Sequence, residues 1–350
     1  MKKLFLLAAF ICSLLTVQTS NAQNPITTLE HAGATSVYYG QNSLVDAYNA
    51  SVKGDYLYLS TGYFTAPEAI AKGVKIIGAG HFPDSLSVAK RTTLLSGLTI
   101  GAGADSLLLE GLYISGDVNY AADISINYVR VFRCRLVSAL FNSSSATASK
   151  NYCSYEECFI DGALNFSNYG VNLLVKHNIL GGLICTSMYC STILNINGFA
   201  LIDGNVIINI AGDWASFYNI ISSKVINNII FAANPFNSCT GNFINNNLFV
   251  SKSFDSGNNS FNINYTGVAQ TNIFVNQTGN TINYTHDYHL KSPTTYLGTD
   301  ATQIGLYGGT TPFKDKGLPS NPQVITKTIG TQTDANGNLL INFSVKAQDN

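Results

Sequence analysis

The sequence predicts an all-β protein, a right-handed parallel β-helix in which short coils of chain stack along one axis. Two observations predict this fold. The motif apolar-x-x-Asn-x-apolar recurs about every 23 residues, and other segments alternate apolar and small polar residues, as a strand with one wet face does. A coil of this length cannot bury an apolar face alone, so we expect successive coils to stack about 4.8 Å apart.

The repeated asparagines are expected to form a ladder along the stack. The repeat positions are Asn178, Asn205, Asn228 and Asn247, a weaker copy at Asn272, cysteine at Cys134 and Cys158, and Gly111 in the preceding copy. We expect each Asn to turn a corner with a left-handed backbone and to bond the Asn one coil away. The apolar residues on either side would then form two inward columns, from Val131 to Ala269 and from Leu136 to Phe274.

Four alternating segments are expected to supply a strand ahead of the Asn corner, at residues 124–127, 164–167, 194–197 and 261–264. Their outward side chains would form a polar face: Ser125, Asn127, Asn165, Ser167, Asn195, Asn197, Asn262 and Asn264. A leucine-rich repeat is the alternative fold, because residues 173–180 match its pattern. That architecture needs a helix or tight turn in each unit, where this sequence has Asn, Ser, Gly and strand-forming residues.

The two ends of the chain differ from the repeat. Residues 43–50 predict a short helix that caps the first coil, and residues 54–59 and 73–80 predict the opening strands. The repeat fades after about residue 290, and the turn at 334–337 before residues 339–345 predicts a closing hairpin. We divide the chain into a signal peptide (1–22), a parallel β-helix with its N-terminal cap (23–290), and a last coil with a small C-terminal β-extension (291–350).

The N-terminus reads as a secretory signal. Lys2 and Lys3 precede an apolar run over residues 4–17, and residues 20–22 form a small-x-small cleavage site. The apolar run is too short to span a bilayer comfortably, and no later stretch is long enough. We therefore expect an exported protein with no transmembrane segment.

Composition narrows the function. The 350 residues include 19 Lys+Arg and 20 Asp+Glu, a net charge of −1, and only 11% are charged while 46% are hydrophobic. This balance excludes a nucleic-acid binder with a basic surface. Six cysteines follow the signal: Cys134, Cys153, Cys158, Cys185, Cys190 and Cys239. They are either buried thiols that pack as small apolar residues or, in an oxidising compartment, disulfides of unknown pairing.

These features resemble the pectin-lyase-like superfamily of right-handed parallel β-helix proteins. The opening strands and the Asn repeat carry the likeness from about residue 35 to 290, and residues 287–309 resemble the end of uncharacterised exported β-helix proteins of Gram-negative bacteria. The resemblance implies the fold and a secreted, periplasmic or cell-surface location. It implies no single activity, because the superfamily includes lyases, glycosidases and adhesins, and their catalytic and calcium-binding residues have no recognisable counterpart here.

A charge cluster precedes the Asn positions. Glu156, Lys176 and Asp203 stand two positions before them, and Arg133, Glu157 and His177 stand one position before. Stacking would place Glu156 and Asp203 about 10 Å apart, near the upper limit for an inverting carboxylate pair, with His177 as a general base. The alternative is an exposed charge ladder, Arg133 with Glu157 and Lys176 between Glu156 and Asp203, in which each pair contributes little.

Candidate ligand-binding residues are Asn165, Ser167, Asn195 and Asn197 on the polar face, together with Trp214. Trp214 either stacks on a sugar ring or packs its loop against the coil. No metal or cofactor motif is present, so we expect neither.

We expect a non-catalytic protein whose polar Asn/Ser/Tyr face binds a polysaccharide or cell-surface glycan or mediates adhesion. The alternative is a polysaccharide lyase or glycoside hydrolase acting on an extracellular glycan through the region of Glu156, Lys176, His177 and Asp203. A third possibility is a purely structural spacer. The sequence leaves the oligomeric state open.

Overall fold

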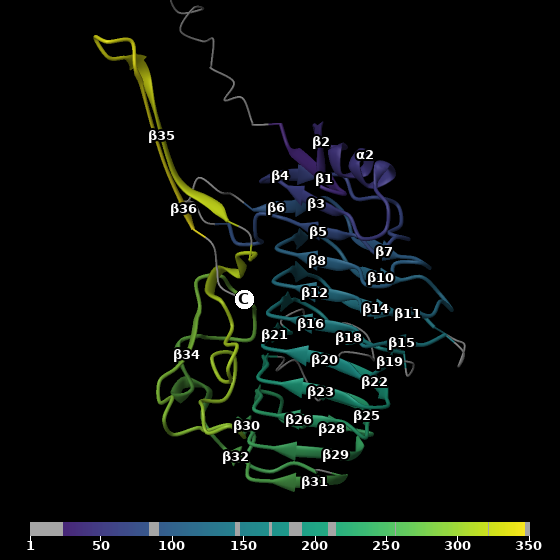
Figure 1. The fold of residues 1–350 in the computed structure, drawn as a ribbon. Coiled ribbons are helices and arrows are strands. Elements are labelled where there is room, and N and C mark those ends of the chain that lie inside the picture. The colour runs from purple at the N-terminus through teal and green to yellow at the C-terminus, as the bar shows by residue number, and fades with distance from the viewer. Residues whose placement is uncertain are drawn as a thin grey trace, which may run out of the picture.

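The computed structural model describes residues 24–83, 91–143, 148–167, 170–181, 191–208, 215–255, 257–320 and 322–346. The chain winds as a parallel β-solenoid whose coils stack along one axis (Figure 1). The predicted parallel β-helix is confirmed, and the leucine-rich alternative is wrong, because strands occupy the half of each unit where that repeat needs helices. The signal segment at 1–22, Trp214, Cys185 and Cys190 lie outside the described residues.

A helix and a hairpin cover the N-terminal end of the stack. The predicted capping helix is α2 (Ser43–Ala50), which buries Leu44, Ala47 and Tyr48 against the first strands. The hairpin, β1 (Ile26–His31) and β2 (Ala34–Tyr39), was not predicted. Because β1 pairs antiparallel with the opening strand β3 (Tyr56–Leu59), it occupies the edge that the solenoid would otherwise expose.

Each coil contributes strands to three faces, and most neighbours within a face are parallel and one coil apart. The first face contains β3, β5 (Lys75–Ile77), β8 (Leu108–Glu110), β12 (Arg130–Phe132), β16 (Ser154–Glu156), β20 (Leu173–Lys176), β23 (Ala200–Asp203), β26 (Lys224–Ile226), β29 (Thr240–Asn245) and β31 (Asn258–Asn262). The second contains β4 (Gly62–Phe64), β6 (Thr92–Leu94), β9 (Tyr113–Ile114), β13 (Arg135–Leu136), β17 (Phe159–Ile160), β21 (Ile179–Leu180), β24 (Val206–Ile207), β27 (Ile229–Ile230), β30 (Leu248–Phe249) and β32 (Tyr265–Thr266).

The third face contains β7 (Leu98–Ile100), β10 (Val118–Tyr120), β14 (Ala139–Phe141), β18 (Leu164–Asn165), β22 (Ile193–Asn197), β25 (Phe217–Ile221) and β28 (Phe236–Asn237). Short strands β11 (Ile126–Asn127), β15 (Lys150–Asn151) and β19 (Gly170–Val171) form a small sheet of their own before the chain re-enters the first face. Both inward columns are confirmed through the central coils, from Val131 to Ile244 on the first face and from Leu136 to Phe249 on the second.

The Asn ladder is confirmed as a continuous row of hydrogen bonds. The Oδ1 atom of Asn205 accepts from both the backbone N and Nδ2 of Asn178, each at 2.9 Å. The same pattern joins Asn205 to Asn228, Asn228 to Asn247, and Asn247 to Asn264. Each amide therefore satisfies buried backbone groups that the turn leaves without a sheet partner.

The last rung is Asn264 and not Asn272, which corrects the prediction for the final coil. Phe261 pairs with Ile244, so residues 261–264 form the strand that enters the ladder rather than the strand ahead of it. Asn272 instead ends a short 3₁₀ helix, η1 (Gln270–Asn272). The spacing favoured Asn272, which follows Asn247 by 25 residues, because the last coil is shorter than the others and Asn264 follows Asn247 by only 17.

Cysteine replaces Asn in two coils because its thiol donates to the same carbonyl positions. The Sγ of Cys158 lies 3.4 Å from the carbonyl oxygen of Val131 and 3.2 Å from that of Glu156. The Nδ2 of Asn228 reaches the equivalent carbonyls of Ile202 and Ile226. Cys134, Cys153, Cys158 and Cys239 are buried free thiols, which confirms the buried-thiol interpretation for these four.

The left-handed backbone falls one residue before the ladder, which corrects the prediction that the Asn itself adopts it. Positive φ angles occur at Gly111, Arg133, Glu157, His177, Gly204, Asn227 and Asn246, which together define the ladder corner between the first and second faces. Gly111 therefore aligns with Arg133, and Leu112 rather than Gly111 holds the ladder position of its coil, which corrects the prediction for Gly111. The residue at this corner points away from the core, whereas the Asn that follows points into it.

From Phe159 to Leu248 the second face is buried on both sides, whereas Tyr63 at its N-terminal end is exposed. Phe159, Ile179, Val206, Ile229 and Leu248 point outward from it, yet each is at most 4% exposed. They pack against residues of the C-terminal segment such as Phe274, Leu290, Leu306 and Phe313, in a second apolar core. This segment includes β33 (Phe274–Asn276) and β34 (Asp287–Leu290) and lies along one side of the stack (Figure 1).

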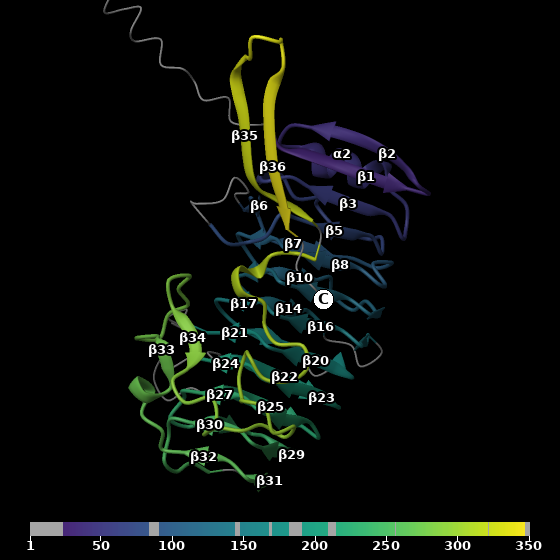
Figure 2. The same ribbon diagram turned by 60° about the vertical axis from the view of Figure 1, so that its left-hand side comes forward.

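Residues 297–320, the C-terminal strap, run back along the ladder corner toward the N-terminal end. Asn246 Nδ2 donates to Leu297 O at 2.9 Å, and at the other end Ser320 N donates to Glu110 Oε1 at 2.8 Å. The predicted closing hairpin, β35 (Gln323–Thr333) and β36 (Leu339–Lys346), follows the strap. It extends beyond the end of the stack that carries α2 (Figure 1, Figure 2).

Candidate functional site

The predicted charge cluster lies along the first face and the ladder corner. Strand pairing places Glu156 opposite Lys176 and Lys176 opposite Asp203, so these three side chains occupy one outward column on successive coils, as the spacing predicts. Arg133, Glu157 and His177 occupy the adjacent column at the ladder corner. The two columns differ in their surroundings, because the C-terminal strap covers the corner.

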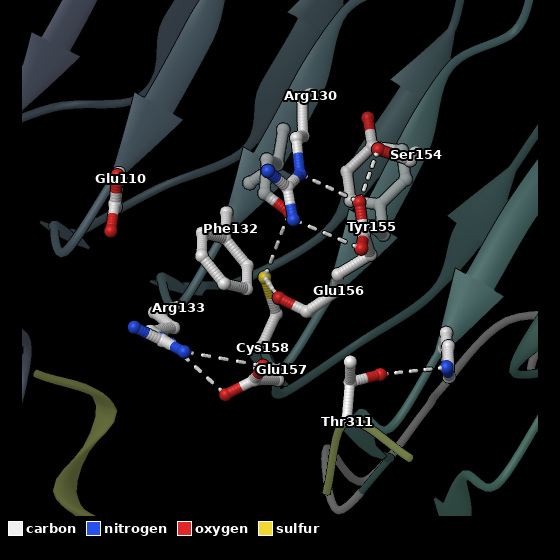
Figure 3. A network of polar contacts seen from close by, with 12 residues as sticks. Glu110, Arg130, Phe132, Arg133, Ser154, Tyr155, Glu156, Glu157, Cys158 and Thr311 are labelled. Atoms are coloured by element: carbon white, nitrogen blue, oxygen red, sulfur yellow. Dashed lines mark hydrogen bonds and ion pairs between the residues drawn. The ribbon is translucent and has the colours of Figure 1, made fainter. Parts of the chain in front are cut away.

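Glu156 forms its ion pair with Arg130 rather than with Lys176, which corrects the expected ladder. Arg130 Nε lies 2.7 Å from Glu156 Oε1 and its NH2 lies 3.1 Å from Oε2 (Figure 3). Ser154 Oγ donates to Oε1 at 2.8 Å. Lys176 Nζ reaches Thr311 of the strap at 3.0 Å instead. Both oxygens of Glu156 are therefore engaged by protein donors.

Arg133 and Glu157 pair as predicted, but the pair is buried and not exposed. Arg133 is 1% exposed, and its Nε lies 3.0 Å from Glu157 Oε2. The strap supplies the remaining partners: Arg133 donates to Leu318 O at 3.2 Å, and Lys314 N donates to Glu157 Oε2 at 3.0 Å. In Figure 3 the two side chains face each other at this corner. The pair thus holds the strap against the solenoid.

Lys176, His177 and Asp203 line one cavity of about 250 Å³ between the corner and the strap, together with Asp300. Burial lowers the pKa of His177 to about 4, and the Lys176 cation acts in the same direction. Burial raises the pKa of Asp203, although Asn227 donates to its Oδ1 at 2.8 Å. At neutral pH His177 is therefore an uncharged imidazole, able to accept a proton, near a carboxyl group and an ammonium.

The predicted ligand-binding amides bond mainly to one another. Asn195 Nδ2 donates to Asn165 Oδ1 at 3.0 Å, and Asn219 Nδ2 donates to Asn195 Oδ1 at 3.1 Å. Asn165 Oδ1 also accepts the backbone N–H of Ser167 at 3.0 Å. Asn197 is exposed. Asn165 and Asn195 therefore serve as a second, half-buried ladder on the third face, and Trp214 lies outside the described residues.

Two tyrosines that were not predicted as site residues lie at the corner where the chain enters the first face. Tyr128 and Tyr152 are 57% and 51% exposed, and their rings stack with centroids 5.0 Å apart and an interplanar angle of 8°. Both have a left-handed backbone, with φ of 60° and 55°. The next coils place Asn172 and then Phe199 at this position, because Leu173 pairs with Ala200. We call this column the open corner.

A row of amides lies beside the stacked rings. Asn151 Nδ2 donates to Asn127 Oδ1 at 3.2 Å, and the backbone N and Nδ2 of Asn127 both donate to Asp105 Oδ1. The sequence did carry a signal for this site: the dipeptide Asn-Tyr occurs at 127–128 and again at 151–152, a spacing of 24 residues that equals the spacing of Cys134 and Cys158. The equal spacing places both dipeptides in register.

Within the described ranges, no three His, Cys, Asp or Glu side chains come together in a group that could hold a metal ion. Nor does any helix there have the length and apolarity to cross a membrane. Comparison of the sequence with protein-family models and with the curated proteins finds no match.

Proposed function

We propose that this protein is a non-catalytic, exported β-helix that binds a polysaccharide or cell-surface glycan along its open corner. The observation that carries the proposal is the stacked, solvent-exposed pair Tyr128 and Tyr152 next to the Asn127–Asn151 amide row. Aromatic rings present flat apolar surface to sugar C–H groups, and neighbouring hydroxyls and amides give hydrogen bonds to sugar hydroxyls.

The arrangement suits an extended ligand. The two Asn-Tyr coils stack about 4.8 Å apart along the solenoid axis, and Phe199, which is 43% exposed, adds a third aromatic side chain to the same column two coils further on. A linear glycan lying along this axis would meet the aromatic and amide groups of several coils in succession. Many weak contacts of this kind add up to useful affinity when they act on one chain.

Export and family membership belong to the proposal. The basic residues, apolar run and small-x-small site at 1–22 support secretion across a membrane to the periplasm, the cell surface or the medium of a Gram-negative-type bacterium. The stacked coils and the Asn ladder support membership of the pectin-lyase-like superfamily.

Affinity electrophoresis of the mature chain tests the function. Gels that contain neutral or acidic polysaccharides should retard the protein, and the double variant Tyr128→Ala/Tyr152→Ala should migrate as in a gel without polysaccharide. The matched control is Tyr63→Ala, because Tyr63 is 59% exposed but lies on the second face. Equal retardation of the double variant and the wild type would overturn the open corner as the binding surface.

A second candidate function is a polysaccharide lyase or glycoside hydrolase, and one observation favours it. The cavity beneath the strap gathers Lys176, His177 and Asp203, which could move a proton between a neutral base and a carboxyl group. Glu156 is paired with Arg130 and does not line this cavity. Incubation with uronate and neutral glycans should yield new reducing ends or unsaturated products that vanish in Asp203→Asn if this function is correct, and no product if it is not.

A further inference from the structure

A second cavity lies on the side of the strap away from the open corner. Its volume is about 290 Å³, and it is enclosed by Phe159 and Ile179 of the second face together with residues of the C-terminal segment. Small-molecule sites in proteins begin at about 300 Å³. The cavity therefore has room for one ring-sized ligand and not for a polymer.

Aromatic rings form the walls of this cavity. Phe159 stacks on Tyr284 and on Phe313, with ring centroids 5.4 Å and 6.1 Å apart and an interplanar angle of 22° in both pairs. Tyr307 stacks on His289 at 3.8 Å and 11°. Packing against strands β17 and β21 holds the floor rigid, since Phe159 and Ile179 are both buried. A ligand in the cavity would contact the half-buried rings of Phe82, Tyr284 and Tyr307, above a floor formed by Phe159 and Ile179.

Polar groups surround the mouth. Asp287 Oδ1 lies 2.7 Å from His289 Nδ1, and Tyr307 OH donates to Asp315 Oδ1 at 2.7 Å. Asn283 and His286 also line the cavity. Among the described residues of the lining there are two carboxylates, Asp287 and Asp315, and no Lys or Arg. Arg135 lies over the Tyr284 ring at 4.6 Å, but Asp161 neutralises it at 2.9 Å.

We infer that this cavity binds a single uncharged pyranose ring, such as one terminal sugar of a glycan. Apolar walls fit the C–H faces of the ring, and the carboxylates, amide and imidazole at the mouth fit its hydroxyls as hydrogen-bond acceptors and donors. The two carboxylates disfavour an anionic sugar, because no Lys or Arg among the described lining residues would compensate its charge. The site shares no residue with the open corner, so the inference does not depend on the function proposed above.

Saturation-transfer NMR on the full mature chain tests the inference. The probes are glucose, galactose, mannose and N-acetylglucosamine, with glucuronate as the charged comparator. At least one neutral sugar should receive saturation at its ring protons, and glucuronate should bind at least about tenfold more weakly at neutral pH. No transfer to any of the four neutral sugars at millimolar concentration, or tighter binding of glucuronate, would overturn the inference.

Three variants test whether the sugar that receives saturation binds in this cavity. Asp315→Asn and Asp287→Asn keep the shape of the mouth and should each weaken binding about three- to tenfold, whereas Tyr307→Ala removes a wall and should abolish transfer. Tyr128→Ala/Tyr152→Ala is the matched control and should bind the monosaccharide as the wild type does. Transfer that survives all three cavity variants would show that the sugar binds elsewhere. Retardation by polysaccharide would then still stand as a separate result for the open corner.

Discussion

Two corners of the same solenoid show how one repeat supports two different uses. At the ladder corner and at the open corner, non-glycine residues take up a left-handed backbone in successive coils. The strap covers the first corner, so that Arg133 is 1% exposed and His177 is 3% exposed. Nothing among the described residues covers Tyr128 and Tyr152, which keep more than half of their surface in solvent.

The difference separates polar groups that hold the fold from polar groups that are free to bind. Charged residues at the ladder corner find their partners within the chain, as Arg133 and Glu157 do with each other and with the strap. Arg133 and Glu157 of the predicted charge cluster therefore have a structural role at this corner. The uncharged Asn-Tyr pairs at the open corner are the better candidates, because both tyrosine rings are more than half exposed beside a half-buried amide row.

The largest expected effect concerns the ladder. In Asn228→Ala, the backbone N–H of Asn205 and the carbonyls of Ile202 and Ile226 lose their buried partner. We expect the free energy of unfolding to fall by about 3 to 5 kcal/mol, measured by urea denaturation. Asn197→Ala is the control, since Asn197 is exposed, and it should change stability by less than about 0.5 kcal/mol. Equal effects of the two variants would contradict the ladder's role.

The next largest loss of stability is expected at the buried ion pair Arg133–Glu157, compared with its exposed neighbour Arg130–Glu156. Glu157→Gln leaves Arg133 charged and buried and should cost about 3 kcal/mol, with faster amide exchange over residues 314–320. Glu156→Gln disrupts a pair in which Arg130 is 45% exposed, and should cost about 0.5 kcal/mol. If hydrogen exchange of the strap were unchanged in Glu157→Gln, the buried pair would not be what holds it.

The ladder corner should also respond to acid. Burial holds the pKa of His177 at about 4, below its ordinary value of 6.5, so the folded state prefers the neutral imidazole. The free energy of unfolding therefore has its full value above pH 6.5 and decreases as pH falls from 6.5 toward 4, because the unfolded chain takes up the proton first. Between pH 6.5 and about pH 5 the free energy of unfolding should fall by about 2 kcal/mol through His177. Across this range the stability of His177→Gln, measured by thermal or urea unfolding, should depend less steeply on pH than that of the wild type. Equal pH dependence in the two proteins would contradict the role of His177.

The coil repeat, the inward columns, the capping helix and the closing hairpin could all be predicted, because each depends on local spacing or on turn residues. The strap could not, because its hydrogen bonds along the ladder corner join residues from 51 to 210 positions apart and it leaves no periodic signal of its own. One clue was present in the apolar residue after each ladder Asn, such as Ile179, Val206 and Ile229. A strand that is apolar at every position is buried on both sides, which implies a cover for the second face.

The candidate site was only partly predictable for a related reason. Register placed Glu156, Lys176 and Asp203 in one column, but spacing cannot show which column a distant segment covers. The polar Asn/Ser face was likewise identified by its alternation, yet alternation cannot show that Asn165 and Asn195 bond each other.

A smaller effect on stability than that of the ladder, the buried ion pair or His177 is expected at the open corner. The double variant Tyr128→Ala/Tyr152→Ala removes one exposed ring stack, worth about 1 kcal/mol, and leaves every ladder hydrogen bond intact. Its midpoint in urea should therefore shift little while its retardation by polysaccharide disappears. A loss of several kcal/mol would instead assign the tyrosine stack to the fold.

The most direct test of the account compares both corners in one measurement. Hydroxyl-radical footprinting of the wild-type protein, with and without a polysaccharide that retards it, reports the solvent exposure of individual aromatic side chains. We expect the bound polysaccharide to protect Tyr128 and Tyr152 from oxidation, while His177 and the control Tyr63 keep the same reactivity. Protection confined to the ladder corner and strap, with Tyr128 and Tyr152 as reactive as in the free protein, would contradict it.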